Sequence, residues 1–292
     1  YLYYIFKMIR NISFILSRNM SHWSHIKKAI PDPIIGLTEQ FNKDNHEKKI
    51  NLSIGVYRQD NGKPLVLNSV KKAKELIKKE NHEYAGIAGL NNYIHKSLQF
   101  AYGNNIDLNK LAAVQTISGT GACRIGAEFI SKNFNNKDIY LPNPTWANHI
   151  PIMKNAGLNV KKYSYYNPDT ISIDFNNMKK DIHMAPNNSI FLFHACAHNP
   201  TGIDPNKEKW DEILDIIKIK NHITFFDCAY QGFASGDHNQ DAYPIRKFYE
   251  ENQPIILAQS FSKNFGLYGE RVGTLSITTN SENEKNNVLS DL

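Results

Sequence analysis

The sequence predicts an α/β fold in which a mainly parallel sheet is sandwiched by helices. Short runs of apolar, β-prone residues alternate with stretches of helical spacing, and this alternation is typical of strand–helix–strand units. The short runs are residues 51–56, 138–141, 190–194, 223–227, 255–260 and 273–278. Helical spacing covers residues 34–41, 70–79, 90–102, 121–132, 146–156, 207–220 and 242–251. Reactive groups should then gather at the carboxyl ends of the strands.

Length and composition predict one large domain with part of a second. The 292 residues, of which 41% are hydrophobic, can bury a large core. Cys123, Cys196 and Cys228 lie far apart without a CxxC pair. We therefore expect small buried thiols, and neither a disulfide framework nor a metal site. We interpret the Asn- and Lys-rich run 176–180 as a solvated loop or as a composition bias without a function.

Most of the net charge of +6 comes from the amino-terminal stretch. Residues 1–31 carry five basic residues and no acidic one, which leaves 29 basic and 28 acidic residues in the rest of the chain. A nearly neutral body argues against nucleic-acid binding.

Residues 8–19 have the properties of a mitochondrial transit peptide. They contain Arg and Ser but no acid, and their apolar residues repeat at helical spacing. A secretory signal is the alternative, but polar residues interrupt the apolar core and no small-residue cleavage site follows. No run reaches the roughly 18 apolar residues of a membrane span. We expect residues 1–20 to be a leader, the protein to be mitochondrial, with a cytoplasmic location as the alternative, and no membrane attachment.

Lys263 lies in the segment 259–273, at the mouth of an apolar strand. A lysine in that position can lose hydration and its proton, and can form a Schiff base with an aldehyde. Ser260 and Arg271 bracket it with a hydroxyl donor and a fixed cation, the pair that a phosphate needs.

A Gly-rich turn at Ser118, Gly119 and Thr120 precedes a helical pattern. Backbone N–H groups at such a helix start attract an anion. Alone, the turn would be an ordinary loop-to-helix junction, but Ser260 and Arg271 would reach the same phosphate.

These segments, together with 198–202 and 225–233, closely resemble the aspartate aminotransferase family of fold type I, whose members use pyridoxal phosphate. The resemblance runs from about Ser21 to the C-terminus, with the motifs in the family's order. It implies a seven-stranded sheet, a homodimer, and pyridoxal 5'-phosphate held by Lys263. It also implies three parts: a leader (1–20), an N-terminal arm with part of the small domain (21–60), and a large cofactor-binding domain (61–292).

Asp227 ends an apolar strand, where an unpaired carboxylate costs several kcal/mol or more. A protonated pyridine nitrogen would be its partner, and the ring would then accept electrons from the substrate's α-carbon. Asn199 and Tyr230 can each donate to the phenolic oxygen of the same ring. Without the resemblance, we would interpret Trp146 as an aromatic residue of the core and His149 as a structural histidine.

The resemblance gives several of these residues a ligand. Trp146 covers one face of the cofactor ring, with His149 behind it, and the small Ala229 lies opposite. Gly55 lies at the edge of the substrate, which Trp146 and Asn199 also bind. Tyr84 reaches the phosphate of the partner subunit.

The implied activity is transamination between L-aspartate and 2-oxoglutarate, with Lys263, Asp227 and Tyr230 as catalytic residues. Two alternatives stay open: an aromatic amino-acid aminotransferase of the same subgroup, and a non-catalytic, truncated chain. Family chains continue past this end, and their carboxylate-binding arginines lie there, whereas the last arginine here is Arg271. A nucleotide-dependent oxidoreductase is excluded because no G-x-G-x-x-G motif follows an early strand.

Overall fold

The structure is a computed structural model that describes residues 2–8, 21–28, 33–77 and 83–292. The chain divides into two compact units, Tyr1–Gly55 and Val56–Leu292. Most of the predicted leader falls in residues 9–20, which lie outside the described residues. Within the described ranges, no helix combines the length and the apolar character needed to cross a bilayer.

The first unit contains helix α2 (Pro33–Lys43), which covers the predicted helix at 34–41. The predicted strand at 51–56 is wrong, because those residues form bends and extended chain without a ladder. Local hydrogen bonding explains the difference. The side-chain oxygen of Asn51 accepts from the backbone N–H of Ser53 at 3.0 Å and from its hydroxyl at 2.6 Å. Such local bonds compete with strand pairing.

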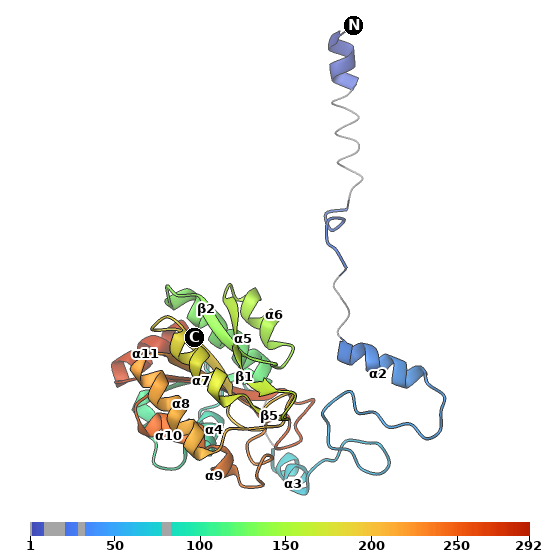
Figure 1. The fold of residues 1–292 in the computed structure, drawn as a ribbon. Coiled ribbons are helices and arrows are strands. Elements are labelled where there is room, and N and C mark those ends of the chain that lie inside the picture. Colours follow the sequence, from blue (N-terminus) through green and yellow to red (C-terminus); the bar gives the residue numbers. More distant parts are fainter. Residues whose placement is uncertain (1, 9–20, 29–32, 78–82) are drawn as a thin grey trace. The chain divides into compact units, whose positions relative to one another are not determined.

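The second unit is built on a seven-stranded sheet of order β1-β9-β8-β7-β6-β2-β3 (Figure 1). Its strands are β1 (Leu111–Ile117), β2 (Asp138–Asn143), β3 (Asn159–Ser164), β6 (Ile190–His194), β7 (Ile223–Cys228), β8 (Ile255–Ser260) and β9 (Val272–Thr278). The run from β3 to β8 is parallel, whereas β9 is antiparallel to both β8 and β1. The predicted mainly parallel α/β sheet is therefore confirmed. Strands β4 (Tyr166–Asn167) and β5 (Ser172–Ile173) form a separate pair.

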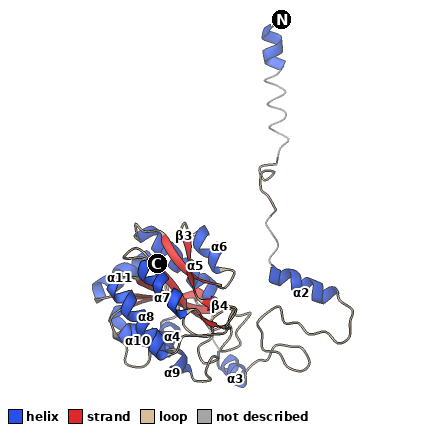
Figure 2. Ribbon diagram, viewed as in Figure 1, coloured by secondary structure: helices blue, strands red, loops and turns tan. Residues whose placement is uncertain are grey.

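Helices surround the strands (Figure 2). The helices of this unit are α3 (Asn68–Leu76), which buries no residue, α4 (Asn91–Tyr102), α5 (Ser118–Asn133), α6 (His149–Asn155), α7 (Phe175–Met184), α8 (Lys207–Ile219), α9 (His238–Asp241), α10 (Tyr243–Glu250) and α11 (Glu282–Asp291), with a 3₁₀ turn at Leu108–Lys110.

Two buried clusters show that both faces of the sheet are covered. Leu192 of β6 belongs to the cluster that contains Ile130 of α5, whereas its neighbour Phe191 belongs to the cluster that contains Trp210 of α8. Successive residues of a strand point to opposite faces, so the central strands are apolar on both. Each such side chain stabilises the fold by about 1.5–3 kcal/mol.

The run 176–180 was predicted to be a loop, but it lies in helix α7. Met178 and Ile182 are fully buried one helical turn apart, so this face packs into the core. The amide of Asn177 donates to Asp174 at the start of the helix, at 2.8 Å. The many polar residues between the two buried positions hid a short helical period.

Candidate active site

Three hydroxyl groups and a guanidinium group meet where β1 and β8 end. Ser118 Oγ lies 2.9 Å from Ser260 Oγ and 2.8 Å from Ser262 Oγ. The Ser262 N–H donates to Ser260 Oγ at 3.3 Å, and Arg271 Nη1 donates to Ser262 Oγ at 3.4 Å. We call these four residues the anion cradle. Hydroxyl and guanidinium donors that surround one point are suited to a phosphate group.

Close backbone approach brings the cradle together. Ser118 adopts a left-handed φ of 57°, and its N–H donates to the carbonyl of Arg271 at 3.2 Å. A Cβ on Gly119 would lie 3.0 Å from the Cβ of Ser260, so only glycine fits there without displacing the serine. A non-glycine residue with positive φ persists where its surroundings hold it, often at a functional site.

Helix α5 begins directly at this turn, earlier than the predicted residue 121. Gly119 and Thr120 lie in its first turn, and no side chain of the preceding Ile117 caps it. The first N–H groups of a helix lack partners within the helix and carry partial positive charge. They add to the donors of the cradle, as predicted for an anion site.

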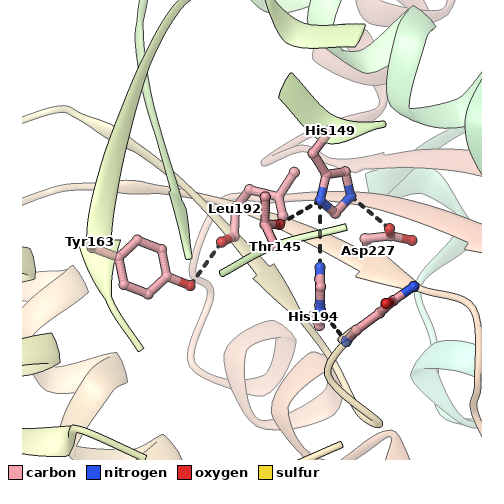
Figure 3. A network of polar contacts seen from close by, with 7 residues as sticks. Thr145, His149, Tyr163, Leu192, His194 and Asp227 are labelled. Carbon is pink, nitrogen blue, oxygen red and sulfur yellow. Dashed lines mark hydrogen bonds and ion pairs between the residues drawn. The ribbon is translucent and has the colours of Figure 1, made fainter. Parts of the chain in front are cut away.

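A chain of polar contacts holds Asp227 at the end of β7 (Figure 3). His149 Nε2 lies 2.8 Å from Asp227 Oδ2. On the other side of the ring, His149 Nδ1 lies 2.8 Å from Thr145 Oγ1 and 3.5 Å from His194 Nε2. The His149 side chain is fully buried, whereas that of Asp227 is 12% exposed. The carboxylate is therefore the open end of this network.

The hydrogen-bond pattern assigns the protons along the network. The Asn199 N–H donates to His194 Nδ1 at 2.9 Å, so a neutral His194 carries its proton on Nε2, toward His149. Burial lowers the pKa of His194 well below its usual value, and electrostatic interaction with His149 and His198 lowers it further. The ring is therefore neutral. His149 Nδ1 then accepts, and its Nε2–H donates to Asp227. This bond fixes the orientation of the Asp227 carboxylate.

Asn199 and Tyr230 lie at the same edge of the sheet. Asn199 follows β6, and Ala229 and Tyr230 directly follow Cys228, the last residue of β7. Burial raises the pKa of Tyr230, and Asp227 and Tyr268 raise it further. The phenol therefore keeps its proton and can act as a hydrogen-bond donor.

Lys263 follows the end of β8 and is partly buried. Burial lowers its pKa, and the like charge of Arg271 lowers it further. Its Nζ lies 5.1 Å from the ring centroid of Tyr268. A lysine with a depressed pKa is neutral more often, and the neutral amine is the nucleophile.

Trp146 stands edge-on to His149, with ring centroids 5.1 Å apart and planes at 87°. It is half-buried, so part of the indole is open to a ligand.

Gly55 ends the first unit, and the Tyr84 side chain is 96% exposed. The roles assigned to Gly55 and Tyr84 stay predictions.

The sequence alone did not single out Ser262 and His194. Ser262 lies two residues after Ser260, and this Ser-x-Ser spacing at a strand end was the available signal. His194 ends the predicted strand 190–194 and pairs in register with Asp227. Adjacent strands had to be known before that pairing could be seen.

Cys123 of α5 lies beside the same carboxylate. Its Sγ and the ligand atoms of His149 and Asp227 lie within 4.8 Å of one another. Burial and the charge of Asp227 raise the pKa of the thiol well above its usual value. A neutral thiol fits the prediction of a small buried side chain. His149 and Asp227 meanwhile bond to each other.

Comparisons with known proteins agree with this fold. Residues 47–291 match the family model for aminotransferases of class I and II. The mitochondrial aspartate aminotransferase of Xenopus tropicalis is 48% identical over 281 residues, which cover 94% of this chain and 66% of that protein. A broad specificity aminotransferase from Leishmania mexicana has a TM-score of 0.90 at 44% identity, covering 93% of this chain and 69% of that one. The cytoplasmic aspartate aminotransferase of Saccharomyces cerevisiae has a TM-score of 0.88 at 44% identity, covering 92% of this chain and 68% of that one.

The fold is therefore an α/β sheet that carries the anion cradle and Lys263 at the carboxyl edge of its parallel strands. The chain belongs to the class I and II aminotransferase family. It spans about two thirds of the length of the relatives that it matches.

Proposed function

We propose that this protein is a pyridoxal-phosphate-dependent transaminase that exchanges the amino group between L-aspartate and 2-oxoglutarate. One observation carries the proposal: Lys263, with a lowered pKa, lies at the same sheet edge as the anion cradle and the partly buried Asp227. The names of the relatives support the choice of aspartate.

The residues present fit the cofactor. The cradle offers three hydroxyls and a guanidinium group to its phosphate. Asp227, whose carboxylate is the open end of its network, would bind the ring nitrogen. Asn199 and Tyr230 would donate to the phenolic oxygen, and Trp146 and Ala229 would cover the two faces of the ring.

Each residue then has a chemical task. When bound, the cofactor supplies an electron sink for the charge left on the substrate's α-carbon. Lys263 Nζ takes the proton from that carbon as a general base and returns it as a general acid. Asp227 would hold its carboxylate against the ring nitrogen, and His149 orients that carboxylate.

Borohydride reduction of the full-length protein, followed by peptide mapping, tests the role of Lys263. Reduction should fix the cofactor on Lys263, and Lys263→Ala should bind it without a covalent link and lose nearly all turnover. Label on a different lysine in the wild type would overturn the assignment.

Substrate choice needs its own measurement, because a relative at 44% identity is described as broad in specificity. Aspartate turnover, coupled to reduction of the oxaloacetate formed, should exceed phenylalanine and tyrosine turnover at equal concentration. The reverse order would favour the aromatic alternative.

The mitochondrial location is also part of the proposal. It rests on the acid-free stretch 8–19 and on the mitochondrial relative, whereas the yeast neighbour is cytoplasmic. Residues 8–30 fused to a fluorescent reporter should direct it to mitochondria. Diffuse cytosolic fluorescence would contradict this.

We further propose a homodimer in which Tyr84 reaches the partner's phosphate. Exposed apolar residues near it, Ile87 and Leu90, support a contact surface. Light scattering on the full-length protein should give twice the monomer mass, and Tyr84→Phe should weaken cofactor binding.

A further inference from the structure

The carboxylate of Asp204 holds the turn that carries Asn199. Asp204 Oδ2 accepts from the N–H of Ala197 at 2.6 Å, and Oδ1 accepts from the N–H of His198 at 2.9 Å. One carboxylate thus satisfies two successive backbone donors with its two oxygens. Hydrogen bonds to an ionised acceptor are about twice as strong as neutral ones.

The turn needs this support because its backbone is strained. Ala197 adopts a φ of 48°, which a residue with a Cβ rarely does. Such a conformation costs on the order of 1–3 kcal/mol and persists when neighbouring groups fix it. The two N–H groups would otherwise lie half-buried without an acceptor.

A second set of contacts fixes the other side of the turn. The Tyr165 ring stacks on His198, with centroids 3.8 Å apart and planes at 14°, and its hydroxyl donates to the carbonyl of Ile203 at 2.6 Å. The Asn199 N–H donates to His194. The backbone on both sides of Asn199 is therefore held, while its side chain takes no part in these bonds.

We propose that Asp204 is a positioning residue for Asn199. It fixes where the Asn199 amide points without touching the cofactor itself. The inference rests on the proposed function, in which Asn199 donates to the phenolic oxygen of the cofactor and so lowers the pKa of its linkage to Lys263. Loss of the Asp204 carboxylate would release the turn and remove that donation.

A double-mutant cycle, read by visible absorbance titration of the full-length, cofactor-loaded protein, tests this. Asp204→Ala and Asn199→Ala should each raise the ratio of protonated to deprotonated linkage about tenfold at fixed pH, since one hydrogen bond to a charged group is lost. The double variant should titrate like Asn199→Ala alone, because Asp204 acts through Asn199.

Asp181→Ala is the matched control. Asp181 Oδ2 likewise accepts a backbone N–H, that of Ser164 at 2.8 Å, away from the cradle. This variant should lose stability yet keep the wild-type titration. If Asp204→Ala does not fold, Asp204→Asn carries the test, because it keeps the volume and one acceptor oxygen.

The outcomes separate the two proposals. A wild type without a titrating band overturns the proposed function and this inference with it. A wild type with the band, combined with an unchanged Asp204 variant or with additive effects in the double variant, overturns the inference alone.

Discussion

Gly273 at the start of β9 lies against Ser118, so closely that a Cβ on Gly273 would come within 2.5 Å of the Ser118 carbonyl carbon. The same Cβ would lie 2.6 Å from the carbonyl oxygen of Gln259. Both neighbours are backbone atoms, which cannot move away by rotating a side chain. The anion cradle therefore depends on the lack of a Cβ at Gly273 as much as on the side chains of its own residues.

Gly273→Ala should destabilise the protein by about 1–3 kcal/mol, because the added methyl group forces backbone shifts in a packed region. It should also weaken phosphate and cofactor binding by displacing Ser118. Urea unfolding and fluorescence titration with the cofactor measure the two effects. Gly269→Ala is the control, since a Cβ there meets nothing within 4 Å. Equal behaviour of the two variants would contradict this account of the cradle.

Asp227→Ala should lower transaminase turnover about 10²–10³-fold, because it removes a preorganised charge from the ring nitrogen. The fold should survive, since this carboxylate lies at the open end of its network. An N-methylated cofactor carries the positive charge permanently and should restore part of the activity. Stopped-flow absorbance with aspartate measures both, and no recovery would limit Asp227 to a structural role.

In the cofactor-free protein, Lys263 should react with an amine reagent at lower pH than an ordinary lysine, because its pKa is lowered by burial and by Arg271. Arg271→Leu should move that reactivity to higher pH. The folded state releases this proton before the unfolded chain does, so the free energy of unfolding should rise with pH between the lowered value and 10.5. Mass spectrometry of Lys263 labelling across pH checks the reactivity. Labelling that follows the exposed lysines in both proteins would refute it.

Acid should destabilise the protein through His198, whose pKa burial lowers to about 3 from 6.5. Between these values the unfolded chain binds the proton and the folded protein does not. Stability is therefore lost as pH falls through this window, at about 1.4 kcal/mol per pH unit for one such group. His198→Phe can keep the stacking on Tyr165 and should reduce the slope. Urea unfolding from pH 7 to pH 4.5 gives the slope, and an identical slope in the variant would rule out His198 as its source.

Much of the fold could be predicted because its strands are strongly patterned. Runs such as 190–194 and 255–260 each begin with four consecutive apolar residues, and the structure gives them the same bounds as β6 and β8. Strand β3 was missed because it lies at the edge of the sheet and carries the polar residues Lys161 and Lys162. Lysine on an edge strand blocks further pairing and weakens the strand signal at the same time.

The local sequence likewise indicated some residues of the candidate site and not others. Ser118, Ser260, Arg271 and Asp227 stood next to glycines or at strand ends, so their positions in the chain suggested a ligand. His194 and Asp204 act through partners far away or through the backbone, as Asp204 does with the N–H of Ala197. Nothing in the local sequence states which N–H a carboxylate will accept. Those contacts needed the pairing of β6 with β7 and the shape of the turn after β6.

The reversed direction of β9 has a consequence for folding. Because β9 runs against both neighbours, its first residues meet the last residues of β1 and β8, where Val272 pairs with Ile117 and Gly273 with Ser260. The cradle is thus assembled from segments about 150 positions apart in the chain, and contacts of such long separation form late and slowly. Phosphate would then bind only after β9 has paired with β1 and β8. The ligand would therefore stabilise the native state and not the partly folded states.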